Sequence, residues 1–150
     1  MNTVFRKAEK RDVPSIRKLI VELAEFEKAP DQVKITEMQL EEDGFGTTAF
    51  YQAFIAEIDG EVVGFSLSFV RYSTWRGKML YMEDLYVTES HRGQKIGSGL
   101  LEKQLEYAKE SGINFLCFQV LDWNQPAISF YKKYDVAYDP EWINGIIPVR

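Results

Sequence analysis

The sequence has little of what several kinds of functional site require. Its single cysteine, Cys117, cannot form an internal disulfide, so we expect a reducing compartment, the cytoplasm. The N-terminus shows no signal-peptide apolar region, and no apolar run approaches membrane-spanning length, so no membrane partner is expected. His91 is the only histidine. Neither a Ser–His catalytic pair nor a metal site is therefore predicted.

An excess of positive charge is also missing. Asp and Glu number 23 against 18 Lys and Arg, which gives a net charge of −5. This balance argues against nucleic acid as a partner and mildly favours a cationic substrate. With 45% hydrophobic and 27% charged residues, the composition is that of a folded protein. At 150 residues, one domain covering the whole chain is the expectation.

Hydrophobic periodicity and turn residues predict an α/β fold. Asp59-Gly60 is a hairpin turn signal, and strands and helices alternate after it, which predicts a mixed sheet with helices on both faces. Strands are predicted at 3–8, 50–58, 61–72, 81–87, 113–121 and around 142–147, and helices at 13–26, after Thr36, from Leu100 to about 111, and around Phe130. Asp12 is the expected N-cap of the first helix.

The stretch from Tyr81 to Gly99 organises the chain. It begins as an apolar strand that contains the adjacent carboxylates Glu83 and Asp84, which are costly in such a run unless something uses them. A glycine-rich turn and a helical pattern follow. The free N–H groups and positive dipole end at such a helix start favour an anion such as phosphate.

Known nucleotide-binding motifs can be tested against this turn. A Walker loop fails because no lysine follows Gly97, and a dinucleotide fingerprint fails because Glu102 stands where glycine is needed. The segment Arg92-Gly93-Gln94-Lys95-Ile96-Gly97-Ser98 instead resembles the pyrophosphate loop of GCN5-related N-acetyltransferases. It departs from that family at Lys95, which replaces a glycine and either strains the turn or adds a charge contact. A glycine-rich turn into a surface helix remains the alternative.

Four motifs in a fixed order extend the resemblance over nearly the whole chain. They are Ser73-Thr74-Trp75-x-Gly77-Lys78, Tyr81-x-Glu83-Asp84-x-Tyr86-Val87, the loop from Arg92, and Leu121-Asp122-Trp123-Asn124-Gln125 with Phe130-Tyr131-Lys132. Together they resemble the spermidine/spermine branch of the family, and most of all its thialysine Nε-acetyltransferase members. The resemblance implies a GNAT fold with strands splayed at an acetyl-CoA site, and direct transfer of acetyl to a primary amine.

The resemblance also implies roles for individual residues. Coenzyme A would be held by the backbone of Leu85, Tyr86 and Val87, by the loop residues Arg92, Gly93, Gln94, Lys95, Ile96, Gly97 and Ser98, and by Asn124 and Tyr131. Glu83 matches the general base, and Tyr131 matches the acid near the thiolate. From the residues alone, Glu83 is equally a structural carboxylate, Tyr131 a core aromatic, and Asn124 a helix N-cap.

The expected substrate is a small amine, and a homodimer is the expected assembly. Substrate-binding residues implied by the resemblance are Glu27, Ser73, Thr74, Trp75, Glu83 and Asp84, with Asp84 pointing to the opposite side of the strand from Glu83. Ser73-Thr74 replaces the Asp-Pro pair of polyamine-acetylating relatives, which favours thialysine or a lysine-like amino acid. Polyamine acetylation, a catalytically silent CoA-binding sensor and a plain structural dimer module are the alternatives.

Overall fold

The computed structural model describes residues 2–149, which divide into two compact units with their boundary along the chain after Gln119. The first unit holds the sheet and the three longest helices, and the second holds one short helix and an extended tail. The prediction of a single domain covering the chain therefore stays a prediction.

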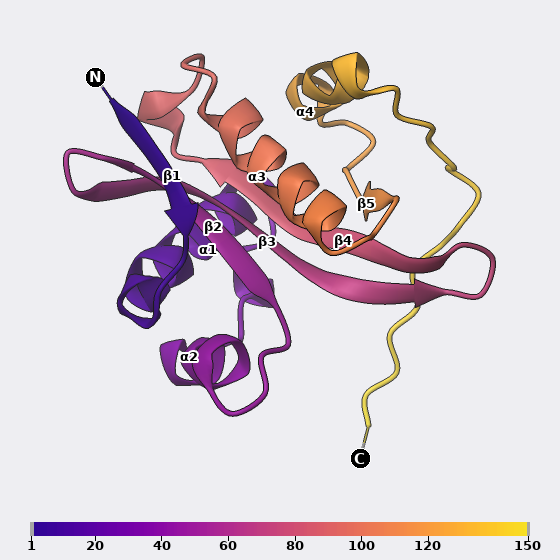
Figure 1. Ribbon diagram of the computed structural model, residues 1–150, viewed down its shortest axis with the longest axis horizontal. Helices are drawn as coiled ribbons and strands as arrows, with labels where there is room; N and C mark the ends of the chain where they lie inside the picture. The colour runs from indigo at the N-terminus through magenta and orange to yellow at the C-terminus, as the bar shows by residue number, and fades with distance from the viewer. Residues whose placement is uncertain (1, 150) are drawn as a thin grey trace. The chain divides into compact units, whose positions relative to one another are not determined.

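The first unit is built on a mixed five-stranded sheet, as the sequence predicts (Figure 1). The strands follow one another in chain order: β1 (Thr3–Lys7), β2 (Gln52–Ile58), β3 (Glu61–Ser73), β4 (Gly77–Val87) and β5 (Leu116–Phe118). Pairing is antiparallel from β1 to β4, and β5 runs parallel to β4. Asp59 and Gly60 both have positive φ, which is the backbone of the tight hairpin turn that this dipeptide predicts.

Helices cover both faces of this sheet, α3 on one and α1 on the other (Figure 1). The helical elements are η1 (Lys10–Asp12), α1 (Val13–Phe26), η2 (Pro30–Gln32), α2 (Glu37–Phe45), η3 (Glu89–His91) and α3 (Ile96–Glu110). On the α1 face, Ile16 and Leu19 pack in a buried cluster with Phe65. On the α3 face, Ile96 and Leu100 do the same with neighbours from β2 and β3. Among residues 2–149, no helix is long and apolar enough to cross a membrane.

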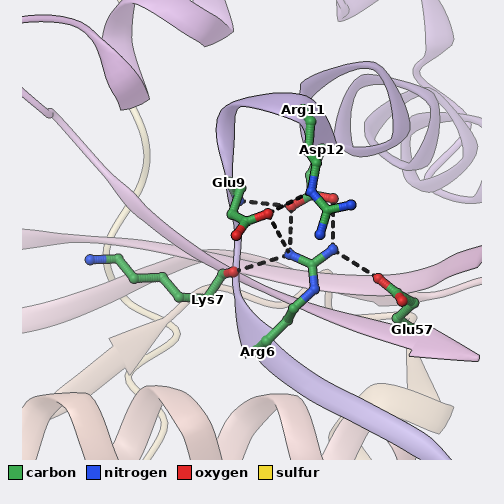
Figure 2. Close-up of polar contacts among 6 residues, drawn as sticks. All are labelled: Arg6, Lys7, Glu9, Arg11, Asp12 and Glu57. Carbon is green, nitrogen blue, oxygen red and sulfur yellow. Dashed lines mark hydrogen bonds and ion pairs between the residues drawn. The ribbon is translucent and has the colours of Figure 1, made fainter. Parts of the chain in front are cut away.

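A charged network ties β1, β2 and the start of α1 together (Figure 2). Arg6 donates to both carboxylate oxygens of Asp12, at 2.8 and 2.9 Å, and to Glu57 at 2.8 Å. Asp12 stands at the predicted N-cap, but its side chain accepts from Arg6 and from the backbone N–H of Glu9 instead of capping α1. Burial raises the pKa of Asp12, but these hydrogen bonds and the Arg6 charge outweigh it, so the pKa lies below its usual value.

Buried polar side chains fix α3 on the sheet. Gln104 of α3 is fully buried; it accepts from the Ser68 hydroxyl at 2.6 Å and donates to the Ser66 hydroxyl at 3.0 Å. A buried polar group is costly unless its hydrogen bonds are made, so this network favours one register of α3 against β3. The start of α3, which follows the predicted phosphate loop, is held in place as a result.

The end of the chain differs from the sequence-based prediction. The second unit contains α4 (Gln125–Tyr131) and η4 (Lys132–Tyr134), but residues 142–147 form no strand. Ile143 and Ile146 are each 93% exposed, and no described strand pairs with them. The last strand was wrongly predicted because an apolar run forms a strand only where a partner edge is available. The strand predicted at 113–121 is likewise shorter, spanning only β5.

Candidate active site

One edge of β4 is left open. β5 pairs only with Leu80, Tyr81 and Met82, so the rest of β4 continues beyond it without a β5 partner. This is the splayed arrangement that the sequence comparison with the acetyltransferase pattern predicts. An unpaired strand edge offers a row of N–H and C=O groups to an extended ligand. Leu85 and Val87 lie on this stretch.

A β-bulge interrupts β4 at the two adjacent carboxylates. Asp84 pairs with Leu67 and Met82 pairs with Ser68, which leaves Glu83 as the extra residue on β4. Leu67 belongs to the cluster on the α1 face, so its partner Asp84 lies on that face too. Glu83 is on the α1 face as well. Phe69 lies two residues from Leu67 and therefore shares its face, Phe69 pairs with Tyr81, and Glu83 lies two residues from Tyr81. The expectation that the two carboxylates point to opposite sides is wrong.

Three carboxylates therefore lie close together, because Glu27 at the end of α1 joins the pair. Burial raises the pKa of Asp84 to about 7, helped by the negative charges of Glu83 and Glu27. Burial and the Glu83 charge also raise the pKa of Glu27. Glu83 itself is exposed. Within residues 2–149, no group of three or more His, Cys, Asp or Glu side chains could hold a metal ion.

The loop after β4, in which the sequence predicts a phosphate site, contains two residues with left-handed backbone. Gly93 has φ of +79° and Lys95, the N-cap of α3, has φ of +62°. Glycine adopts this left-handed conformation without penalty, whereas lysine does so at a cost of roughly 1–2 kcal/mol. Ile96 is buried and anchors the first turn, so the N–H groups of Gly97 and Ser98 stand at the positive end of the helix.

Arg92 packs back onto β4. Its Nε donates to the Val87 carbonyl at 3.0 Å, and its guanidinium carbon lies 5.3 Å from the Tyr86 ring centre and 5.1 Å from that of Phe26. The Val87 carbonyl is therefore engaged within the chain. Arg92 thus links the end of α1, the end of β4 and the loop, while Gln94 and Lys95 are exposed.

The role of Glu22 was not predicted from the sequence. This α1 residue accepts hydrogen bonds from Thr88 Oγ1 at 2.8 Å and from the Tyr86 hydroxyl at 3.3 Å. It therefore fixes the end of β4 immediately before the loop. The only signal in the sequence is a carboxylate at a position of α1 between the apolar residues Leu19 and Leu23.

Asn124 and Tyr131 lie in the second unit. Asn124 caps α4 by accepting from the Ala127 N–H at 3.3 Å, so its N-cap interpretation is confirmed. Tyr131 is buried, and burial together with Tyr138 and Tyr134 raises the pKa of its phenol. A raised pKa keeps the phenol protonated at neutral pH. The approach of either residue to the open edge of β4 stays a prediction.

Ser73, Thr74 and Trp75 form the tip of the β3–β4 hairpin. The Ser73 hydroxyl accepts from the backbone N–H groups of Trp75 and Arg76 at 3.2 and 3.1 Å, and Trp75 is 85% exposed. Glu83 lies six residues beyond Gly77 on β4, which corresponds to about 20 Å of strand. One chain therefore does not bring the hairpin tip and the carboxylates together.

Comparison with known proteins agrees with this geometry. The model of the acetyltransferase (GNAT) family matches residues 13–135. A thialysine N-epsilon-acetyltransferase of Bos taurus is 47% identical over 137 residues, covering 86% of this chain and 81% of that protein. The thialysine N-epsilon-acetyltransferase of Mus musculus is 43% identical over 154 residues, covering 95% of this chain and 91% of that protein.

Solved structures share the fold at lower sequence identity. An aminoglycoside acetyltransferase from an uncultured soil sample aligns with a TM-score of 0.79 at 17% identity, covering 99% of this chain and 97% of that one. A predicted acetyltransferase of Clostridium acetobutylicum, solved with acetyl-CoA, aligns with a TM-score of 0.78 at 20% identity, covering 97% of this chain and 96% of that one. Because the family model covers most of the chain and both thialysine acetyltransferases are more than 40% identical to it, the chain belongs to the acetyltransferase (GNAT) family and is an N-acetyltransferase that uses acetyl-CoA.

Proposed function

We propose that the protein transfers the acetyl group of acetyl-CoA to the terminal amine of a small amino acid, thialysine or a lysine-like analogue. The observation that carries this proposal is the bulge in β4, which places Glu83 and Asp84 on one face beside the open strand edge. The edge suits an extended pantetheine, and the carboxylates suit a cationic amine. The names of the relatives support the choice of thialysine.

The carboxylates prepare the nucleophile. An alkyl amine with a pKa near ~10.4 is about one part in 10³ neutral at pH 7, so its deprotonation costs about 4–5 kcal/mol without a base. Glu83 takes that proton, directly or through water, while Asp84 and Glu27 hold the cationic amine beforehand. The neutral nitrogen then attacks the thioester carbonyl, forming the C–N bond. A backbone N–H of the β4 edge can stabilise the oxyanion.

The second half of the reaction breaks the C–S bond. The departing electron pair forms the coenzyme A thiolate, which takes a proton from Tyr131. The attacking nitrogen loses its second proton as the amide forms, and that proton restores the phenol of Tyr131. The phenol is protonated at neutral pH, so it has a proton to give. Arg92, Lys95 and the N–H groups at the start of α3 hold the diphosphate, and Asn124 adds a hydrogen bond to the cofactor.

A homodimer completes the proposal. The Ser73–Trp75 tip is too far along β4 to reach the carboxylates of its own chain, so a role in substrate binding requires the tip of a second copy. The tip carries hydroxyls and an exposed indole, which can contact an amino acid by hydrogen bonds and by packing.

The cytoplasm is the proposed location, because the unpaired Cys117 is compatible with a reducing compartment.

Substrate choice gives the first test. Two hydroxyls at Ser73 and Thr74 cannot neutralise the extra charge of a polyamine, and one lost charge-assisted contact costs roughly 1.5–3 kcal/mol. We expect kcat/KM for thialysine to exceed that for spermidine by about 10- to 150-fold. The measurement is coenzyme A thiol release with each amine at saturating acetyl-CoA.

Two variants at the tip make this test specific. Ser73→Asp adds a charge, and Ser73→Asn has the same shape without one; both can still accept from the Trp75 and Arg76 N–H groups. The thialysine-to-spermidine ratio should fall in Ser73→Asp alone. A parent ratio below one would favour the polyamine alternative. Tight coenzyme A binding without turnover of any amine would instead support the alternative of a catalytically silent CoA-binding sensor.

Lys95 gives a prediction in which stability and binding change in opposite directions. Lys95→Gly relieves the left-handed strain and should raise the free energy of unfolding by up to about 1 kcal/mol. It also removes a cation, so the Kd for coenzyme A should rise about two- to fivefold. Urea unfolding and calorimetric titration at two salt concentrations measure the two effects. Lys95→Asn tolerates positive φ without a charge; unchanged affinity in both variants would exclude a phosphate contact.

A further inference from the structure

The α1 face of the sheet continues past the carboxylates. Phe69, Arg71, Tyr81 and Cys117 lie on it together: Tyr81 pairs with Phe69 on β3 and with Cys117 on β5, and Arg71 lies two residues beyond Phe69. Residues paired across a sheet share a face, and residues two apart on a strand share it as well. Tyr81 also stands two residues before Glu83. These four residues, called the β3–β5 strip below, therefore extend the acidic site along β4.

Arg71 is the only cation of this strip, and it lies over Tyr81. Its guanidinium carbon is 5.6 Å from the Tyr81 ring centre. Its charge and a side-chain hydrogen bond also reach the Cys117 thiol, where they oppose the rise in pKa that burial causes. Arg71 is exposed, and within residues 2–149 it forms no ion pair with a carboxylate. A guanidinium stacked on a ring keeps its in-plane N–H groups available for a carboxylate.

The charges of this face match two groups of a lysine-like amino acid, its carboxylate and its terminal ammonium, in sign and in spacing. Glu27, Glu83 and Asp84 form the negative end, and Arg71 over Tyr81 forms the positive end. Tyr81 and Glu83 are separated by about 6.6 Å of strand. The carboxylate carbon and the terminal nitrogen of an extended lysine-like chain are about 7–8 Å apart, from ordinary bond lengths. One such molecule can therefore place its amine at the acids and its carboxylate at Arg71.

We propose that Arg71, held over Tyr81, binds the α-carboxylate of the amine substrate and makes the enzyme selective for amino acids over plain diamines. The proposal rests on the proposed function and adds a specificity residue that the sequence motifs do not contain. A diamine would place a cation against Arg71, which is repulsive, whereas a carboxylate can form two parallel hydrogen bonds with it.

The test compares two substrates that differ only in the carboxylate. Thialysine and its decarboxylated counterpart, bis(2-aminoethyl) sulfide, are assayed for kcat/KM at saturating acetyl-CoA. Arg71→Met should lower kcat/KM for thialysine about 10- to 150-fold and leave the diamine unchanged or improved. Arg71→Lys should recover part of the loss, because it keeps the charge without the planar fork. Lys78→Met is the matched control.

Lys78 suits this purpose because it is a cation of the same hairpin on the other face, paired with Tyr72. Its replacement should leave both substrates unaffected. Equal losses for both substrates in Arg71→Met, or no loss for thialysine, would overturn the carboxylate site while leaving the proposed reaction intact. If the parent enzyme acetylates neither amine, the proposed function itself fails, and the site fails with it.

Discussion

Replacing Tyr131 by phenylalanine is expected to lower kcat by about 10²–10⁴-fold, the usual effect of removing a general acid. The thiolate would then leave without a proton donor. The Kd for acetyl-CoA should stay nearly unchanged, because phenylalanine keeps the ring that is packed 5.1 Å from Phe130. Stopped turnover with intact binding, measured by thiol release and calorimetry, separates an acid from a residue that only packs.

Tyr134→Phe is the matched control for this prediction. Tyr134 lies on η4, three residues beyond Tyr131, and carries the same hydroxyl. Its replacement should change kcat by less than twofold. If Tyr131→Phe retains the parent kcat, Tyr131 is a core aromatic and another group protonates the thiolate.

The second large effect is expected at Glu83. Glu83→Gln keeps the size and hydrogen bonding of the side chain but removes the base, so kcat at pH 7 should fall by about 10²–10⁴-fold. The rate should recover partly at high pH, where more of the amine is already neutral. The pH profile of kcat, measured from pH 5 to pH 10, distinguishes this result from a structural defect, which would lower the rate equally at every pH.

Asp84 should also affect the pH profile of kcat, in the region around pH 7. Its pKa of about 7 means that the carboxylate pair still holds a proton near neutrality, so the activity of the parent enzyme should rise through pH 7 as that proton leaves. Asp84→Asn removes the group that titrates near pH 7, so this rise should disappear while turnover continues with Glu83 as the base. If Asp84→Asn instead abolishes turnover while Glu83→Gln retains it, Asp84 is the base.

Local patterns predicted much of this fold, because each depends on neighbours in sequence. The apolar spacing of α1, the Thr36–Gln39 capping box and the Asp59-Gly60 turn all occur as expected. The strand expected around 142–147 does not form, because a strand depends on a partner edge that no local pattern encodes. Asp12 at the predicted N-cap position similarly binds Arg6, a contact from another element.

The site was predicted less completely than the fold. The adjacent carboxylates Glu83 and Asp84 marked the position, but strand alternation predicted opposite faces, and the bulge reverses that result. A bulge is a property of the pairing between β3 and β4 and leaves no signal in β4 alone. Arg71 was missed for the same reason, since its nearness to Tyr81 arises from cross-strand register.

Identifying the product tests the proposed reaction most directly. Thialysine and acetyl-CoA are incubated with the enzyme, and the acetylated product is located by fragmentation mass spectrometry alongside the release of coenzyme A thiol. We expect one thiol to be released for each thialysine acetylated, with the acetyl group on the terminal nitrogen. Acetylation of the α-nitrogen, or thiol release without an acetylated amine, would contradict it.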